Sequence, residues 1–356
     1  MGVLFFLRRM LDRLRINYSK DGLKDAFKGY FVIGSSVSPR LVGQFGQMIS
    51  REFNSLTAEN AMKPISTEPQ EGCFDWENAD IIADFCRKNH IKLRGHTLLW
   101  HQQIGSWMYS DKDGNLLSKE EFYSKMREHI FAIVHRYKDV VYAWDVVNEA
   151  IAEIPTNPDQ PLRESPMWQI AGEEFIYKAF EYAHEADPDA LLFYNDYDEA
   201  NPEKSKQIFA LVKRMKDAGV PIDGIGMQGH YDIHNPTSEE VDQAISKYKT
   251  LVNHIHITEL DLRIHPGDPP EWREVISEPK RKVRLSKVEE ELQIQRYVDF
   301  FRVFMKHADV IDCVSFWNLG DRDSWLGVAN SPLLFDVYYL PKKSYFAIKN
   351  LGLFRS

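Results

Sequence analysis

The sequence predicts an α/β fold, a single (β/α)8 barrel of the TIM type with its active site at the C-terminal ends of the strands. Two observations lead there: eight short β-branched or aromatic runs, and longer segments of helical period between them. A length of 356 residues suits one such barrel or two ordinary domains. The chain carries no glycine-rich phosphate-binding motif, so a doubly wound nucleotide-binding sheet is less favoured.

The predicted elements alternate along almost the whole chain. Strands are expected over residues 31–37, 53–59, 92–100, 141–149, 190–196, 224–230, 254–261 and 313–319. Helices are expected over residues 77–89, 120–137, 173–186, 202–218, 238–252 and 287–307. Several of these helices begin near Ser, Asp, Asn or Pro, as at Ser238, which is followed by Glu240.

The domain organisation predicted from this pattern is simple. Residues 1–25 are expected to form an N-terminal helical extension, and residues 26–356 the catalytic barrel. Irregular stretches follow three strands, at 151–172, 262–286 and 320–340. In a barrel such loops rise from the rim where active sites are built. The first two are rich in proline and are predicted to be ordered loops without helices.

Composition argues against several classes of partner. The chain has 44% hydrophobic and 27% charged residues, which is typical of a globular protein. Its formal net charge of -9 disfavours nucleic acid and anionic lipid surfaces. No apolar run approaches the ~18–20 residues of a membrane span. Three cysteines, Cys73, Cys86 and Cys313, lack paired spacing and are expected to be free thiols.

The first residues, MGVLFFLRR, place a five-residue apolar run before the arginines. A secretory signal peptide has its basic residues first and a longer apolar stretch after them. We therefore expect a cytoplasmic protein. No cofactor and no metal ion are expected, and the sequence leaves the oligomeric state open.

Polar side chains end almost every predicted strand. Strands that fill a barrel interior end in apolar residues unless their ends serve a site. In order, the ends carry Glu59 and Asn60, His96 with Trp100 and His101, Asn148 and Glu149, Asn195 and Asp196, Gln228 and His230, Glu259 and Asp261, and Trp317 with Asn318. Any one of these could be a satisfied structural group. Together they are typical of a site for a hydroxyl-rich ligand, and a carbohydrate fits.

Two of these residues form a pair able to break a glycosidic bond. Glu149 ends the fourth strand and Glu259 the seventh, on opposite sides of an eight-stranded ring. One carboxyl group can protonate the leaving oxygen while the other acts as nucleophile or base. We expect Glu149 to need a raised pKa and Glu259 a carboxylate held ionised by hydrogen-bond donors.

From about residue 25 to 352 the chain resembles glycoside hydrolase family 10, the endo-β-1,4-xylanases, and is similar to an intracellular type. The resemblance rests on TAENAMKP (57–64), RGHTLLWH (94–101), WDVVNEA (144–150), FYNDY (193–197), GIGMQGHY (224–231), ITELD (257–261) and SFWNLGDRDSWLG (315–327). It implies that Glu149 is the general acid/base and Glu259 the nucleophile of a retaining mechanism. Their carboxyl groups should then lie ~5–5.5 Å apart.

The resemblance also implies supporting roles. His230 would donate a hydrogen bond to Glu259, and Asp261 would orient the imidazole. Asn148 would contact the 2-hydroxyl of the sugar at the cleavage point. Gln228 and His96 would bind further hydroxyl groups of the same ring.

The remaining implied residues bind the substrate and shape its site. Glu59, Asn60 and Lys63 match positions that hold the next sugar toward the non-reducing end. The aromatic walls match Trp100, Trp317 and Trp325. In the family these walls leave little room for a hydroxymethyl group, which would favour xylan over cellulose.

Three other functions remain to be weighed. A metal-dependent barrel hydrolase would use histidines, but His254 and His256 are expected to face the helices, opposite Glu259. A non-catalytic carbohydrate-binding barrel would not need both glutamates intact. A retaining enzyme of the same clan directed at β-1,4-glucan keeps the chemistry and changes the sugar. A cytoplasmic enzyme would cut imported xylo-oligosaccharides, since a polymer could not reach it.

Overall fold

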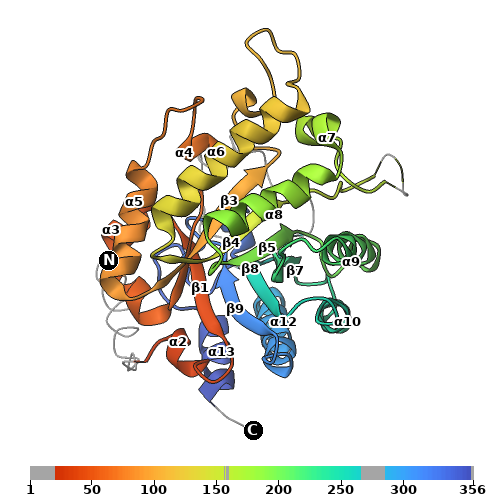
Figure 1. Cartoon of the computed structure of the whole chain (residues 1–356). Coiled ribbons are helices and arrows are strands. Elements are labelled where there is room, and N and C mark those ends of the chain that lie inside the picture. Colours follow the sequence, from red (N-terminus) through yellow and green to blue (C-terminus); the bar gives the residue numbers. More distant parts are fainter. Residues whose placement is uncertain (1–20, 156, 158–159, 266–284, 354–356) are drawn as a thin grey trace.

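Eight parallel strands close into a barrel in the computed structural model, which describes residues 21–155, 157, 160–265 and 285–353 (Figure 1). The barrel strands are β1 Val32–Val37, β2 Ser55–Ala58, β3 Lys92–Trp100, β4 Val141–Asn148, β5 Leu191–Asp196, β6 Gly224–Met227, β8 His254–Arg263 and β9 Ile311–Phe316. Each pairs in parallel with its neighbours, and pairing between β6 and β8 completes the ring. The predicted (β/α)8 barrel is confirmed.

The predicted strand over residues 224–230 is divided in two. After β6 ends, the backbone breaks at Gln228 and Gly229, and a short strand β7, His230–Asp232, pairs with β8. Gly229 adopts φ +77°, a left-handed conformation that glycine takes without steric cost. The break places the side chains of Gln228 and His230 at the mouth of the barrel rather than within a continuous strand.

Helices surround the strands, and all six predicted helices are present within a few residues of their expected limits. They are α5 Glu77–Asn89, α6 Lys119–Tyr137, α8 Glu174–Ala186, α9 Pro202–Asp217, α10 Ser238–Tyr248 and α12 Lys287–Lys306. Reciprocal capping boxes begin α6 at Ser118, α10 at Thr237 and α12 at Ser286. The cap of α10 is therefore Thr237, one residue before the predicted Ser238.

Further helices were not predicted from the sequence. They are α2 Leu23–Ala26, α3 Pro39–Glu52, α4 Pro64–Thr67, α7 Pro166–Ala171, α13 Lys343–Leu353 and the 3-10 turns η1 Ser106–Met108 and η2 Val328–Asn330. The expectation that residues 151–172 hold no helix was wrong, because α7 lies there. Ser165 caps it by accepting a hydrogen bond from the Trp168 amide, and Pro166 occupies its first turn.

Two predicted segments fall largely outside the described residues. The extension over residues 1–25 is described only from residue 21 onward, where α2 begins at Leu23. The loop over residues 262–286 is described only at its two ends. The limits of both stay predictions.

A layer of charged and polar side chains crosses the barrel interior beneath the site. Arg94 on β3 pairs with Asp145 on β4 at 2.7 Å, and its Nε donates to His256 Nδ1 at 3.0 Å. Strands β3 and β8 are not neighbours, so this contact runs through the barrel and His256 points inward. The prediction that His256 faces the helices was wrong. A register shift between Ile257 and Leu260 puts Glu259 on the inward side as well.

The histidines gather no metal site in the part of the chain that is described. His254, the other histidine of this strand, pairs with Asp312 at 2.6 Å near the opposite end of the barrel from Glu259. Across the described ranges, no group of three or more His, Cys, Asp or Glu side chains is arranged to hold a metal ion.

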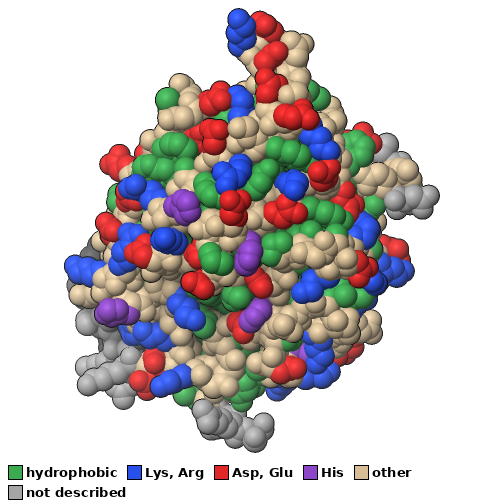
Figure 2. Space-filling view, viewed as in Figure 1, with side chains coloured by type: hydrophobic (Ala, Val, Ile, Leu, Met, Phe, Trp, Pro, Cys, Tyr) green, Lys and Arg blue, Asp and Glu red, His purple; other side chains and the backbone are tan. Residues whose placement is uncertain are grey.

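The surface in Figure 2 carries acidic and basic side chains interspersed, without a large area of one sign. Such a mixed surface agrees with the modest net charge of the sequence. Among the helices of the described ranges, none is both long and apolar enough to cross a lipid bilayer.

Candidate active site

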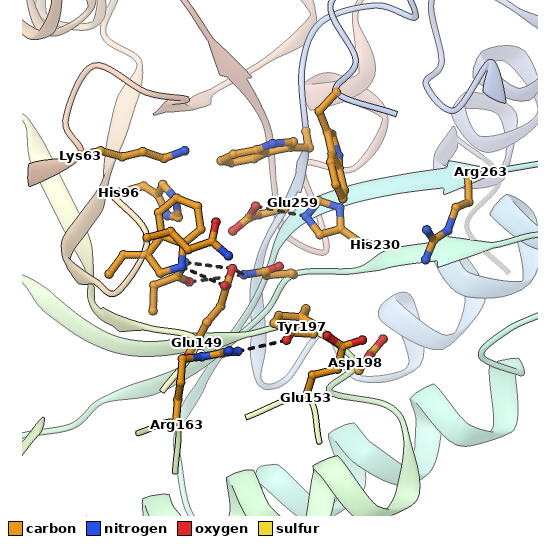
Figure 3. A pocket seen from close by; sticks show the side chains of 16 residues that line it. Lys63, His96, Glu149, Glu153, Arg163, Tyr197, Asp198, His230, Glu259 and Arg263 are labelled. Carbon is orange, nitrogen blue, oxygen red and sulfur yellow. Dashed lines mark hydrogen bonds and ion pairs between the residues drawn. The ribbon is translucent and has the colours of Figure 1, made fainter. Parts of the chain in front are cut away.

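A cavity of about 560 Å³ opens at the C-terminal ends of the barrel strands (Figure 3). Ten of the predicted site residues line it: Lys63, His96, Trp100, Asn148, Glu149, Gln228, His230, Glu259, Trp317 and Trp325. The other three are next to it: Asn60 accepts a hydrogen bond from Lys63, Glu59 lies near the charge of Lys63, and Asp261 contacts His230 and Trp325. The structure therefore brings together the strand ends that the sequence singles out.

Glu149 follows β4 directly and is almost wholly buried. Its Oε2 accepts a hydrogen bond from Trp100 Nε1 at 2.8 Å. Its Oε1 accepts from Gln228 Nε2 at 2.9 Å and from Asn148 Nδ2 at 3.2 Å. Donors from β3 and from the break after β6 thus fix the position of the carboxyl group.

Glu259 lies on β8, facing the same cavity. Its Oε1 accepts a hydrogen bond from Asn195 Nδ2 at 2.9 Å, and its Oε2 lies 3.3 Å from His230 Nε2. On the other side of the imidazole, Nδ1 lies 3.0 Å from Asp261 Oδ1. Asp261 is held in turn by a hydrogen bond from Trp325 Nε1 at 2.8 Å.

The two glutamates have pKa values shifted in opposite directions. Burial raises the pKa of Glu149, and the negative charges of Asp196 and Glu259 raise it further against the hydrogen bonds it accepts. Burial also acts to raise the pKa of Glu259, but the hydrogen bond from His230 and the nearby imidazoles outweigh it and lower that pKa. One carboxyl group is poised to hold a proton and the other to stay ionised.

The hydrogen bond from His230 is the largest of the effects that lower the pKa of Glu259. Burial alone would lower the pKa of His230, but the adjoining carboxylates of Asp261 and Glu259 raise it to about 10. The imidazole is therefore a cation at neutral pH. A cation beside Glu259 favours the carboxylate form that a nucleophile requires.

Asn195, at the end of β5, joins the two halves of the site. Its Nδ2 donates both to Glu259 Oε1 and to Asn148 Oδ1, each at 2.9 Å. Thr258 Oγ1 donates to Asn195 Oδ1 at 2.8 Å and sets the orientation of the amide. A single side chain thereby links the neighbourhood of Glu149 with Glu259.

Lys63 marks one end of the cavity. Its Nζ donates to Asn60 Oδ1 at 2.9 Å and lies 4.8 Å from the centre of the Trp100 ring. Glu59 is half-buried beside it, and burial raises the pKa of Glu59 against a hydrogen bond from Asn318 and the charge of Lys63. These groups offer donors and acceptors suited to sugar hydroxyls.

The remaining predicted wall residues are held by their neighbours. His96 Nδ1 donates to the carboxylate oxygen Asp145 Oδ2 at 2.9 Å, and the His96 ring lines the cavity. Trp317 meets the His96 ring edge-on at 5.3 Å and the His230 ring at 6.3 Å. Trp325 meets His230 at 5.0 Å.

Six further lining residues were not predicted: Gln102, Glu153, Arg163, Tyr197, Asp198 and Arg263. Tyr197 and Asp198 directly follow the polar end of β5, and Arg263 lies two residues beyond Asp261, so the strand-end argument, extended by two residues, would have found them. Arg163 gives no such signal, because it is placed beside Glu149 by the antiparallel bridge between Ile151 and Leu162 and not by a strand end (Figure 3).

Comparison with known proteins agrees with this geometry. Residues 22–351 match the family described as Glycosyl hydrolase family 10. A curated endo-1,4-beta-xylanase/feruloyl esterase of Xylanibacter ruminicola is 48% identical over 334 residues, covering 91% of this chain. This chain spans only 46% of that longer protein.

Two further relatives match almost end to end. Endo-1,4-beta-xylanase B of Paenibacillus barcinonensis is 41% identical, with 92% of this chain and 97% of that protein covered. A solved structure described as a psychrophilic glycoside hydrolase family 10 endo-beta-1,4-xylanase has 63% sequence identity and a TM-score of 0.87. The alignment covers 93% of this chain and 99% of that one.

Proposed function

The chain belongs to glycosyl hydrolase family 10, and from this we propose that it is a retaining endo-β-1,4-xylanase. It would hydrolyse internal β-1,4-xylosidic bonds of xylan or xylo-oligosaccharides. One observation carries the proposal: Glu149 and Glu259 line the same cavity with their pKa values shifted apart. That pairing suits one carboxyl group to act as the acid and the other as the nucleophile.

The first step is glycosylation of Glu259. Protonated Glu149 gives its proton to the glycosidic oxygen as the bond from that oxygen to the anomeric carbon breaks. The Glu259 carboxylate attacks the same carbon from the opposite face and forms a covalent glycosyl-enzyme ester. The shortened chain with its new hydroxyl group then leaves from the side of Glu149.

The second step releases the sugar. Glu149, now a carboxylate, takes a proton from water, and the water oxygen bonds to the anomeric carbon as the Glu259 ester bond breaks. Two inversions restore the original β configuration. The supporting roles expected of His230, Asp261 and Asn148 belong to this proposal: His230 and Asp261 keep Glu259 ionised, and Asn148 binds the sugar 2-hydroxyl.

The substrate is proposed from the relatives and from the walls of the cavity. The curated relatives are named endo-1,4-beta-xylanases. Trp100, Trp317, Trp325 and Lys63 line the cavity. Asn60 and Glu59 are neighbours of Lys63. Hydroxyl-binding groups between indole faces suit a pyranose chain, and steric exclusion of the glucose hydroxymethyl group would select xylose.

Relative activity on two matched substrates tests the assignment. We expect kcat/KM of the wild type for xylotetraose to exceed that for cellotetraose by ~10-fold or more, since every glucose ring adds a hydroxymethyl group that the site must fit or reject. Glu149→Ala and Glu259→Ala should each lose xylotetraose hydrolysis, while Glu174→Ala, an exposed carboxylate on α8, should retain it. Equal or faster cleavage of cellotetraose would favour a glucan-directed enzyme, and no cleavage of either would favour a binding protein.

The predicted cytoplasmic location and the use of imported xylo-oligosaccharides are separate proposals. Fractionation of the producing cells, with the activity measured on long xylan and on short oligosaccharides, tests both. Activity recovered from the culture medium would contradict the first. Activity on long xylan alone would contradict the second.

A further inference from the structure

The backbone that carries Glu149 adopts an unusual conformation. Glu149 has φ +57°, in the left-handed region that residues other than glycine seldom enter. Such a conformation persists only where the surrounding contacts determine it. We name residues 149–151 the acid turn. Contacts around this turn must hold Glu149 in its left-handed conformation.

Arg163 holds the acid turn from the solvent side. Its Nε donates to the Glu149 carbonyl oxygen at 3.4 Å, and its Nη2 to the Ile151 carbonyl oxygen at 3.5 Å and to the Tyr197 hydroxyl at 3.2 Å. The Arg163 amide also donates to the carbonyl oxygen of Ala150 at 2.7 Å. All three carbonyl groups of the turn thus accept from this one residue.

Lys204 holds the same turn from the protein interior. It lies on α9 with its side chain only 7% exposed, and its Nζ donates to the Ile151 carbonyl oxygen at 3.1 Å. The same ammonium group pairs with Asp196 Oδ1 at 3.1 Å. Asp196 Oδ2 accepts from Tyr194, whose hydroxyl oxygen accepts the Ile151 amide at 3.2 Å.

Two cations therefore donate to the same Ile151 carbonyl oxygen. Tyr197 lies between them, because its hydroxyl accepts from Arg163 and its ring centre is 4.3 Å from Lys204 Nζ. Neither cation contacts the carboxyl groups of Glu149 or Glu259 in the hydrogen bonds and ion pairs of the described residues. Both instead donate to carbonyl oxygens of the backbone that carries Glu149.

We propose that Arg163 and Lys204 are positioning residues that hold the acid turn in its left-handed conformation and so aim the Glu149 proton at the glycosidic oxygen. The inference rests on the proposed function. Proton transfer needs its donor within hydrogen-bond reach of the leaving oxygen, so a small displacement of the turn weakens acid catalysis. Glu259 lies on β8, and in the hydrogen bonds and ion pairs of the described residues neither cation pairs with that strand, so the nucleophilic attack should be unaffected.

Substrates that differ in their need for a proton separate the two steps. The leaving group of xylotetraose is a shorter xylo-oligosaccharide, which departs as an alkoxide unless Glu149 protonates it. The leaving group of 2,4-dinitrophenyl β-xylobioside is 2,4-dinitrophenolate, which is stable without a proton. The value of kcat/KM reports the glycosylation step for both. If Glu149 is displaced, kcat/KM should fall for xylotetraose and stay unchanged for 2,4-dinitrophenyl β-xylobioside.

The variants are Arg163→Met and Lys204→Met, which keep much of the aliphatic bulk and remove the charge. For each, kcat/KM on xylotetraose should fall ~10–100-fold while kcat/KM on the dinitrophenyl substrate changes by less than about threefold. Lys206→Met, two residues along α9 in an exposed ion pair with Glu203, should change neither value. Arg163→Lys should recover part of the loss, since it restores one donor.

Folding is checked by circular dichroism and by labelling Glu259 with 2,4-dinitrophenyl 2-deoxy-2-fluoro-β-xylobioside, which requires an intact nucleophile. An equal fall on both substrates, or no fall on xylotetraose in either variant, would overturn the inference. Should Lys204→Met fail to fold, Arg163→Met decides alone. Failure of the wild type to cleave xylotetraose would instead refute the proposed function, so the two failures are distinguishable.

Discussion

At the scale of the residue, two identical carboxyl groups acquire different properties from their surroundings. Glu149 meets neutral donors and negative charges, while Glu259 meets a cationic imidazole. Both are buried, so burial by itself would raise the pKa of each. The sign of the nearest charge decides which of them stays ionised.

Replacing His230 should shift the acidic limb of the pH profile of kcat/KM. Because the imidazole lowers the pKa of Glu259, His230→Asn should let that pKa rise, so that Glu259 becomes protonated at a higher pH. The acidic limb of kcat/KM for 2,4-dinitrophenyl β-xylobioside should move to higher pH by about one unit or more. His234→Asn, on the exposed loop that follows β7, is the matched control. An unmoved acidic limb in the His230 variant would show that the imidazole does not set this pKa.

Single residues differ in how far the sequence predicts them. Glu149, Glu259, His230 and Asp261 lie at or near the ends of the strands predicted from the sequence, so a barrel brings them together once its strands are recognised. The bridging role of Asn195 requires knowing that its amide reaches both Asn148 on β4 and Glu259 on β8, and β8 is not a neighbour of β5 in the barrel.

At the scale of the element, one glycine permits two strands to pack. A Cβ atom built on Gly95 of β3 would lie 2.0 Å from Cε3 of Trp144 on β4, far inside van der Waals contact. Trp144 is fully buried, so its ring has little room to move away. The register of β3 against β4 depends on this close contact between Gly95 and the Trp144 ring. The position of His96 relative to Glu149 depends on it as well.

Gly95→Ala should therefore destabilise the barrel by ~1–3 kcal/mol or more, measured as the free energy of unfolding in urea. Gly43→Ala on α3 is the matched control, because nothing lies within 4 Å of its added Cβ. In a helix, alanine is favoured over glycine by up to about 1 kcal/mol, so this variant should be as stable as the wild type or more so. Similar losses from both substitutions would contradict the packing argument.

Elements were predicted from the sequence where one periodicity persists. The strands are rich in β-branched and aromatic residues, and α6 and α12 repeat their apolar positions without interruption. Helix α3 was not predicted, because Gly43 and Gly46 weaken its helical pattern and Phe45 leaves the helical conformation. The break between β6 and β7 was missed because apolar and polar residues continue to alternate through Gly229.

At the scale of the whole molecule, a buried carboxyl group connects several barrel units. Glu199, after β5, is fully buried, and its Oε1 accepts from the Tyr231 hydroxyl of β7 at 2.6 Å. Its carbonyl oxygen accepts from the Tyr248 hydroxyl of α10 at 2.8 Å. Burial raises the pKa of Glu199 from 4.5 to about 7. The folded protein thus binds this proton more tightly than the unfolded chain does.

The stability of the protein should depend on pH through this group. The stabilisation by protonated Glu199 is fully present below pH 4.5, falls as pH rises from 4.5 to about 7, and is absent above that. Glu199→Gln removes the titration, so relative to the wild type it should gain about 3 kcal/mol between pH 5 and pH 8. Urea unfolding at the two pH values measures the difference. Glu203→Gln, on the exposed side of α9, should show no such pH dependence. An equal effect of Glu199→Gln on stability at pH 5 and pH 8 would contradict the raised pKa of Glu199.

The central claim is that Glu149 and Glu259 carry out a double displacement on a xylo-oligosaccharide. NMR of xylotetraose hydrolysis tests it most directly, because the configuration of the first product is recorded before the anomers equilibrate. The account predicts that wild type releases the β-anomer first and that Glu149→Ala and Glu259→Ala both lose this cleavage. An initial α-anomer, or undiminished cleavage by either variant, would contradict it.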